Sequence, residues 1–173
     1  MKRDYRKPLA IFFSKSLLRS PLTRSPVCDF TGESKFCPVI ADVSETSDES
    51  IKKVMICTGQ VYAALQRYRA AHGIDNVAIT RVEELSPFPF GPLKDNIDKY
   101  RNAQQVVWVQ EEHYNSGAWH HVRDCIETVL KHSKYHSCAL QYAGRKVSAT
   151  TAAGSKKTHA AEEEALLVEA FSN

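Results

Sequence analysis

A cluster of two carboxylates and an imidazole, Glu111-Glu112-His113, follows the apolar run Val106–Val109. Carboxylates and imidazoles are the side chains that most often act as general acids and bases. Neighbouring side chains on an extended chain point to opposite sides, so Glu111 and Glu112 cannot face each other as an acid–base pair there. We therefore expect the cluster to form structural ion pairs or an interface, with contact to a ligand as the alternative.

Basic residues near the ends of predicted strands form a second candidate group. A phosphate or carboxylate ligand is bound by convergent Arg and Lys side chains, often beside the N-terminus of a helix. The alternative is that these side chains only cap strand ends, as they do in many α/β domains. The candidate site for an anionic effector consists of Lys15, Arg19, Gln60, Arg81, Arg145 and Lys157.

Motifs for common cofactors and nucleophiles are incomplete. The segment Gly154–Thr158 resembles the end of a phosphate-binding P-loop, but Ala149 stands where the upstream glycine is required. Gly59 follows a predicted strand without the rest of a dinucleotide-binding motif, and the sequence contains neither GxSxG nor the glycine-aspartate-glycine of thiamine-diphosphate sites. The five cysteines include no CxxC pair, so we predict reduced thiols and no metal site.

Length and composition bound the class of protein. The 173 residues, 43% of them hydrophobic, predict one globular domain over residues 1–173. A net charge of +3 does not indicate a nucleic-acid partner, and no apolar run is long enough to predict a membrane span. A basic arm (1–7) and an acidic loop (42–51) are expected to be solvated, and a binding surface for anions or a partner is the alternative near the N-terminus. We expect a piece of a longer chain, because its first predicted strand begins so early.

Strands and helices are predicted to alternate along most of the chain. Strands are expected at Pro8–Ser14, Phe36–Ala41, Lys53–Cys57, Asn76–Arg81, Gln105–Val109 and Ala139–Ala143. Helices are expected from Gln60 to Gly73 and at Leu93–Tyr100, Trp119–Lys131 and His159–Phe171, with one or two helical turns at Lys15–Ser20. Residues 144–154 form a loop of small residues. This alternation predicts an α/β fold with a mostly parallel sheet and helices on both faces.

An aromatic turn at Ser86–Pro92 interrupts the alternation. Its prolines and glycine disfavour regular structure. We expect Phe88 and Phe90 to be anchors for a neighbouring domain or subunit.

Several motifs occur in a fixed order over nearly the whole chain: RKPL (6–9), KSLLR (15–19), CTGQVY (57–62), AITRVEELSPFPF (78–90), QEEH (110–113), YAGR (142–145) and SKKTH (155–159). By these motifs the sequence resembles the C-terminal domain of the E1 component of 2-oxoglutarate dehydrogenase. The related 2-oxoadipate type is the alternative, and SPFPF and KKTH favour the 2-oxoglutarate type. The usual Ala-Thr-Gly of the family stands here as Ala152-Ala153-Gly154, which puts a ligand contact from Ala153 in question.

The resemblance implies a fold like the transketolase C-terminal domain, a three-layer α/β/α sandwich whose mostly parallel sheet has one antiparallel strand. It implies a parent homodimer that decarboxylates 2-oxoglutarate with thiamine diphosphate and Mg²⁺ and succinylates the lipoyl group of the E2 partner. The catalytic and cofactor residues of that parent lie in preceding domains, so this chain alone is expected to be inactive and to hold no cofactor.

Regulation and location are further implications of the resemblance. Some relatives respond to acetyl-CoA or adenine nucleotides, so acetyl-CoA or AMP is the expected ligand of the basic cluster. A self-sufficient effector-binding module is therefore the alternative to a scaffold domain. The expected location is the mitochondrial matrix for a eukaryotic source and the cytoplasm for a bacterial one.

Overall fold

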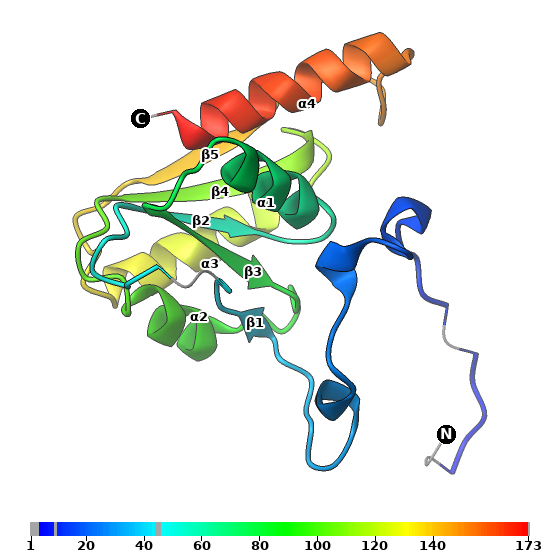
Figure 1. The fold of residues 1–173 in the computed structure, drawn as a ribbon, viewed down its shortest axis with the longest axis horizontal. Helices are drawn as coiled ribbons and strands as arrows, with labels where there is room; N and C mark the ends of the chain where they lie inside the picture. Colours follow the sequence, from blue (N-terminus) through cyan, green and yellow to red (C-terminus); the bar gives the residue numbers. More distant parts are fainter. Residues whose placement is uncertain (1–3, 9, 44–45, 173) are drawn as a thin grey trace. The chain divides into compact units, whose positions relative to one another are not determined.

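The computed structural model describes residues 4–8, 10–43 and 46–172. The chain divides into two compact units, Met1–Ser34 and Lys35–Asn173 (Figure 1). The prediction of one domain over residues 1–173 stays a prediction.

The sheet of the second unit contains, among the described residues, five strands in the order β1-β3-β2-β4-β5. Strands β2, β3, β4 and β5 run parallel, and β1 pairs with β3 in the antiparallel sense. The strands are β1 (Val39–Ile40), β2 (Lys53–Cys57), β3 (Val77–Val82), β4 (Gln105–His113) and β5 (Leu140–Arg145). The sequence predicted an edge strand at this place, because Pro38 has no backbone N–H to donate within a sheet. The short antiparallel strand β1 is that edge strand.

Helices cover both faces of this sheet (Figure 1). They are α1 (Val61–Ala71), α2 (Phe90–Ile97), α3 (Trp119–Lys131) and α4 (Lys156–Phe171). Successive residues of a strand point to opposite faces, so Ile56 packs with α2 and α3 while Met55 packs with α1 and α4. The three-layer α/β/α fold with one antiparallel strand is therefore confirmed.

Several boundaries differ from the prediction, among them those of β4, α2 and α4. Strand β5 also continues to Arg145, into the loop predicted for residues 144–154. Strand β4 extends to His113 rather than Val109, with a register shift between Gln110 and His113 where it pairs with β5. Helix α2 begins at Phe90, inside the turn predicted for Ser86–Pro92, because a proline in the first helical turn loses no intrahelical hydrogen bond. Helix α4 begins at Lys156 instead of His159, since Ser155 Oγ accepts a hydrogen bond from the Thr158 backbone N–H at 3.1 Å.

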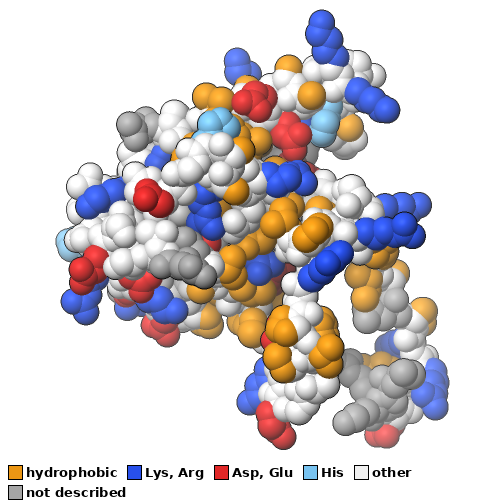
Figure 2. Space-filling model, viewed as in Figure 1, with side chains coloured by type: hydrophobic (Ala, Val, Ile, Leu, Met, Phe, Trp, Pro, Cys, Tyr) orange, Lys and Arg blue, Asp and Glu red, His pale blue; other side chains and the backbone are white. Residues whose placement is uncertain are grey.

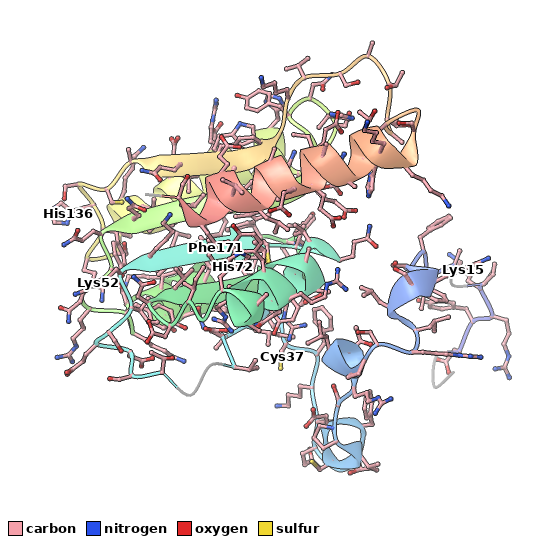
Figure 3. The ribbon with its side chains drawn as sticks, turned by 45° about the horizontal axis from the view of Figure 1, so that its top comes forward. Lys15, Cys37, Lys52, His72, His136 and Phe171 are labelled. Carbon is pink, nitrogen blue, oxygen red and sulfur yellow. The ribbon has the colours of Figure 1, made fainter. Side chains whose placement is uncertain are left out.

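The C-terminal end of α4 is attached to both α1 and the sheet. The Tyr68 ring stacks on His72 and on Phe171, with centroid distances of 4.0 and 4.9 Å, and Figure 3 shows His72 and Phe171 close together. The Lys53 ammonium donates hydrogen bonds to the carbonyls of Ala170 (3.1 Å) and Ser172. A buried lysine thus satisfies carbonyls that a helix end leaves unpaired.

The first unit contains the 3₁₀ helices η1 (Lys15–Leu17), η2 (Pro21–Thr23) and η3 (Val27–Phe30). The helical turn expected at Lys15–Ser20 is thus present as η1. The strand expected at Pro8–Ser14 is wrong for its described residues, Pro8 and 10–14, which pair with no strand; Leu9 lies outside the described residues. A strand needs a neighbour to accept its backbone hydrogen bonds, and the first unit supplies none among its described residues.

The acidic loop at 42–51 is less solvated than expected. The Asp42 carboxylate is only 4% exposed and forms an ion pair with Arg69 of α1, with Nη1 and Oδ2 2.6 Å apart. Ile51, at the other end of the loop, is buried. Residues 44 and 45 lie outside the described residues.

Candidate functional site

The carboxyl ends of the parallel strands meet at one edge of the sheet. In the register of the ladders, Cys57 of β2 lies beside Arg81 of β3 and Val109 of β4, and Val109 lies beside Ala143 of β5. Open α/β sheets bind their ligands outside this edge. The edge is therefore the candidate functional site. Arg81, Glu111 and Arg145 lie in the last residues of β3, β4 and β5, and Gln60 lies at the start of α1.

Gln110 holds the exit of β4 in place. Its side chain is 1% exposed, and its Oε1 accepts hydrogen bonds from Trp108 Nε1 (3.1 Å) and from the Trp119 backbone N–H (3.0 Å). Its Nε2 donates to the carbonyls of Glu112 (3.3 Å) and His113 (3.1 Å). The side chain thus fixes the Glu-Glu-His segment against the start of α3. The sequence alone does not reveal this role, since its only signal is a polar residue directly after an apolar run.

The two carboxylates that follow lie in different surroundings. Glu111 is half-buried and accepts a hydrogen bond from Gln60 Nε2 at 2.5 Å, whereas Glu112 is exposed. Burial raises the pKa of Glu111 above its ordinary value; the Gln60 amide opposes this shift and the charge of Glu112 adds to it. This bond joins the exit of β4 to the start of α1.

His113 and Arg145 attach the end of the sheet to the segments after it. The His113 side chain is buried, and its Nδ1 donates to the Lys146 carbonyl at 2.9 Å. The buried Arg145 guanidinium donates to Glu162 Oε2 at 2.5 Å and to His159 Nδ1 at 3.1 Å. Because a guanidinium only donates, His159 accepts this bond through an unprotonated Nδ1. Both Arg145 bonds hold α4 against β5.

Arg81 lies on the other side of the edge and already has partners. Its guanidinium carbon is 4.2 Å from the centroid of the Tyr62 ring, and its Nη1 lies 3.5 Å from Glu83 Oε1. Its buried Nε has no hydrogen-bond partner among the described residues. Tyr62 belongs to α1, so this contact holds the Arg81 guanidinium against that helix.

The structure brings together only part of the predicted effector cluster. Gln60 and Arg145 both act on Glu111, since the charge of Arg145 also lowers its pKa. Lys157 is exposed in the first turn of α4. Lys15 and Arg19 belong to the first unit, whereas the other members of the cluster belong to the second. A site made of all these residues stays a prediction.

Two cavities adjoin the site, and Arg145 and His113 line both. The larger, of about 930 Å³, lies between β5 and α4 and has an aromatic wall formed by Tyr114 and Tyr142, whose ring centroids are 5.0 Å apart. Burial raises the pKa of Tyr142 to about 12, so its hydroxyl is neutral in ordinary conditions. The smaller, of about 160 Å³, is lined by Glu111, Glu112, His159 and residues 151–153. Residue 153 borders this cavity. It is alanine in this chain, at the position where the family usually has threonine.

The two phenylalanine rings of the aromatic turn differ in burial. Phe88 packs against the core formed with α2 and α3, whereas Phe90 is 44% exposed. The two ring centroids are 5.1 Å apart in an edge-to-face arrangement. Phe88 thus supports the position of Phe90 within the chain, and a role for Phe90 in an interface stays a prediction.

The described residues contain no group of three or more His, Cys, Asp or Glu side chains that could hold a metal ion. No described helix is long and apolar enough to cross a membrane. The charged groups at the sheet edge are mostly engaged with one another. The site as built positions neighbouring segments.

The mostly parallel sheet, its antiparallel edge strand and its polar carboxyl edge define a transketolase-type C-terminal α/β domain. A solved structure described as a split-gene transketolase in an inactive β4 tetramer superposes with a TM-score of 0.51, covering 82% of this chain and 43% of that one at 15% identity, which supports the fold alone. The family model described as the 2-oxoglutarate dehydrogenase C-terminal domain matches residues 24–171. The chain belongs to this family.

Curated relatives agree with this assignment. The chain is 44% identical to the mitochondrial 2-oxoglutarate dehydrogenase of Schizosaccharomyces pombe and 42% identical to that of Saccharomyces cerevisiae, over 98% of this chain and 17% of each relative. It is 37% identical to the 2-oxoglutarate dehydrogenase E1 component of Brucella anthropi, over 100% of this chain and 18% of the relative. The chain thus spans less than a fifth of these relatives. Their mitochondrial and bacterial sources agree with the conditional expectation for location.

Proposed function

We propose that this chain is the C-terminal domain of a 2-oxoglutarate dehydrogenase E1 polypeptide and supports its active site and dimer without supplying catalytic groups. The parent reaction is the decarboxylation of 2-oxoglutarate followed by transfer of the succinyl group to the lipoyl arm of E2. The observation that carries the proposal is the 44% identity to a 2-oxoglutarate dehydrogenase over 98% of the chain. The alternatives, a 2-oxoadipate enzyme and a separate effector-binding module, are not favoured by these relatives.

The geometry of the site supports a scaffold role. Gln110, Glu111 and Arg145 form hydrogen bonds that join β4 and β5 to the helices α1, α3 and α4. Thiamine diphosphate with Mg²⁺ would supply the chemistry of decarboxylation in the parent. The residues described here do not fit that pair, since they contain neither a metal-holding cluster nor the glycine-aspartate-glycine motif. We therefore assign the cofactor to the rest of the parent.

The partners proposed for this domain follow from the same role. They are the preceding domains of the E1 polypeptide, a second E1 subunit in a homodimer, and the lipoyl-bearing E2 of the parent complex. The exposed Phe90 ring, supported from below by Phe88, suits an apolar contact with one of the first two.

A chimera tests the proposed function. This chain replaces the matching 17% of the Schizosaccharomyces pombe relative, and 2-oxoglutarate-dependent release of CO₂ is measured. We expect turnover with 2-oxoglutarate, and none from this chain alone or from the relative without the segment. A chimera that folds and assembles but does not consume 2-oxoglutarate would contradict the proposal.

The effector role is tested separately, by calorimetric titration of this chain with acetyl-CoA and with AMP at two salt concentrations. Saturable, salt-sensitive heat that Arg81→Ala or Arg19→Ala weakens would support the anionic-effector site. Titrations that show no heat with either ligand would leave the scaffold role as the only proposed function.

A further inference from the structure

The first unit exposes large apolar side chains along most of its described length. None of its described residues, 4–8 and 10–34, is buried, and Figure 2 shows hydrophobic side chains on its surface. The exposed set includes Ile11, Phe12, Phe13, Leu18, Leu22, Val27 and Phe30. Soluble proteins rarely leave apolar side chains exposed at this density unless another surface covers them.

Polar hydrogen bonds order this unit locally, and none of its described residues belongs to an apolar core. Thr23 Oγ1 donates to the carbonyls of Leu17 (2.7 Å) and Ser20 (2.9 Å), and Ser20 Oγ accepts from the Leu22 backbone N–H at 3.3 Å. These bonds fold the 3₁₀ turns while leaving the apolar side chains outside. The unit therefore has a fixed local shape and an uncovered apolar surface.

The segment Ala10–Phe13 has the sequence of a strand that is buried on both faces. Ile11 and Phe13 would point to one face of a strand and Phe12 to the other, and these side chains are 70%, 64% and 97% exposed in this chain. A continuous apolar run of this kind occurs in strands inside parallel sheets that helices cover on both sides. Pro8, just before the run, is tolerated at the start of a strand.

We propose that Ala10–Phe13 forms a strand in the sheet of an adjoining α/β domain, built by the part of the same polypeptide that precedes this domain. This inference rests on the proposed function. The relatives' match covers 98% of this chain, so it leaves at most a few residues of the first unit without a counterpart. The match is only 17% of the relative and falls in a domain described as C-terminal, so most of the relative's chain precedes it. That preceding chain is the occupant with enough sequence to supply such a sheet.

Hydrogen exchange, which does not depend on turnover, tests this proposal. Amide exchange at residues 10–13 is measured in this chain alone and in the chimera with the Schizosaccharomyces pombe relative. We expect ordinary fast exchange in the chain alone and exchange slower by about 100-fold or more in the chimera, because a strand inside a sheet opens rarely. Phe12→Asp should abolish the protection in the chimera, whereas the apolar strand former in Phe12→Ile should keep it.

The outcomes separate this proposal from its alternatives. Protection that appears in the chain alone and grows with concentration, together with a dimer in light scattering, would make a second copy the occupant and overturn the proposal. An active chimera with fast exchange at residues 10–13 would keep the proposed function and also overturn the strand. Protection in an inactive chimera would keep the strand while the function fails. If Phe12→Ile lost protection as fully as Phe12→Asp, a residue-specific contact would replace the strand.

Discussion

At the scale of single residues, the turn between β4 and α3 depends on the match between Gln110 and Gly117. The Gln110 amide is held by hydrogen bonds from two sides and cannot move aside. A Cβ atom added at Gly117 would overlap that amide. Sequence reasoning recognised the Gln-Glu-Glu-His segment but looked for chemistry in its carboxylates. The side chain that organises it was identified only from the tertiary contacts.

Replacing Gly117 with alanine should therefore destabilise the protein. We expect a loss of about 1–3 kcal/mol in the free energy of unfolding, because the new methyl group overpacks a buried and fixed amide. Urea denaturation followed by fluorescence of the tryptophans measures it. Gly91→Ala is the matched control, since no atom lies within 4 Å of its added Cβ, and in the first turn of α2 it should gain up to about 1 kcal/mol. Equal effects at the two positions would refute the packing argument.

A second prediction concerns the pH dependence that Glu111 causes. Its pKa in the folded protein is raised from the ordinary value of 4.5, chiefly by burial, so the folded state binds this proton more tightly than the unfolded state does. The stability from this group is thus fully present below the ordinary pKa and is lost as pH rises through the raised pKa. Glu111→Gln cannot ionise, and its amide oxygen still accepts from Gln60. We expect this variant to be more stable than the wild type at neutral pH.

Thermal melts between about pH 3 and pH 8 provide the measurement. The advantage of Glu111→Gln should shrink to nothing below the ordinary pKa of the carboxyl, where both proteins are uncharged at this position. Glu164→Gln, which removes an exposed carboxylate of α4, should show no comparable pH-dependent gain. An advantage that grew toward acid pH would have the wrong sign for a raised pKa.

At the scale of the elements, α1 is tied to the segment between β1 and β2 by a buried ion pair. Arg69 binds both oxygens of Asp42, at 2.6 and 3.0 Å, and also donates to the Val77 carbonyl at 2.9 Å. The sequence predicted α1 from its apolar spacing and assigned no role to Arg69. The pairing with Asp42 spans 27 positions, so no local pattern could indicate it.

Removing the carboxylate of this pair should be costly. Asp42→Ala leaves the Arg69 guanidinium buried without its counter-ion, and we expect a loss of about 3–5 kcal/mol in the free energy of unfolding. Chemical denaturation monitored by circular dichroism tests this. Asp124→Ala removes the partner of Arg123 in an exposed pair and should change stability by less than about 1 kcal/mol. Comparable losses from both substitutions would show that burial does not set the cost.

At the scale of the whole molecule, both hydrophobic cores are built by residues of the second unit. Their members run from Val39 to Phe171 and include none of residues 1–34. We expect deletion of residues 1–34 to leave the melting temperature within about 2 °C of the full chain, since the cores remain complete. Differential scanning calorimetry of the two chains measures the shift. An unfolded or strongly destabilised product would mean that the first unit takes part in folding of the second.

The sequence by itself determined the layered fold, because apolar spacing at two and at 3.6 residues is a local property of strands and helices. It placed β2 and α3 at their observed bounds and located Glu111 and Arg145 at the carboxyl edge of the sheet. It could not show that Arg145 is used by Glu162 and His159, or that Gln110 anchors the turn, since those partners lie far apart in sequence or in another element. The same limit explains Ala10–Phe13, where a strand-like sequence forms no strand with the described residues of its own unit. Only tertiary structure decides which partner a side chain or a strand finds, because the free energy of burial and hydrogen bonding depends on neighbours in space.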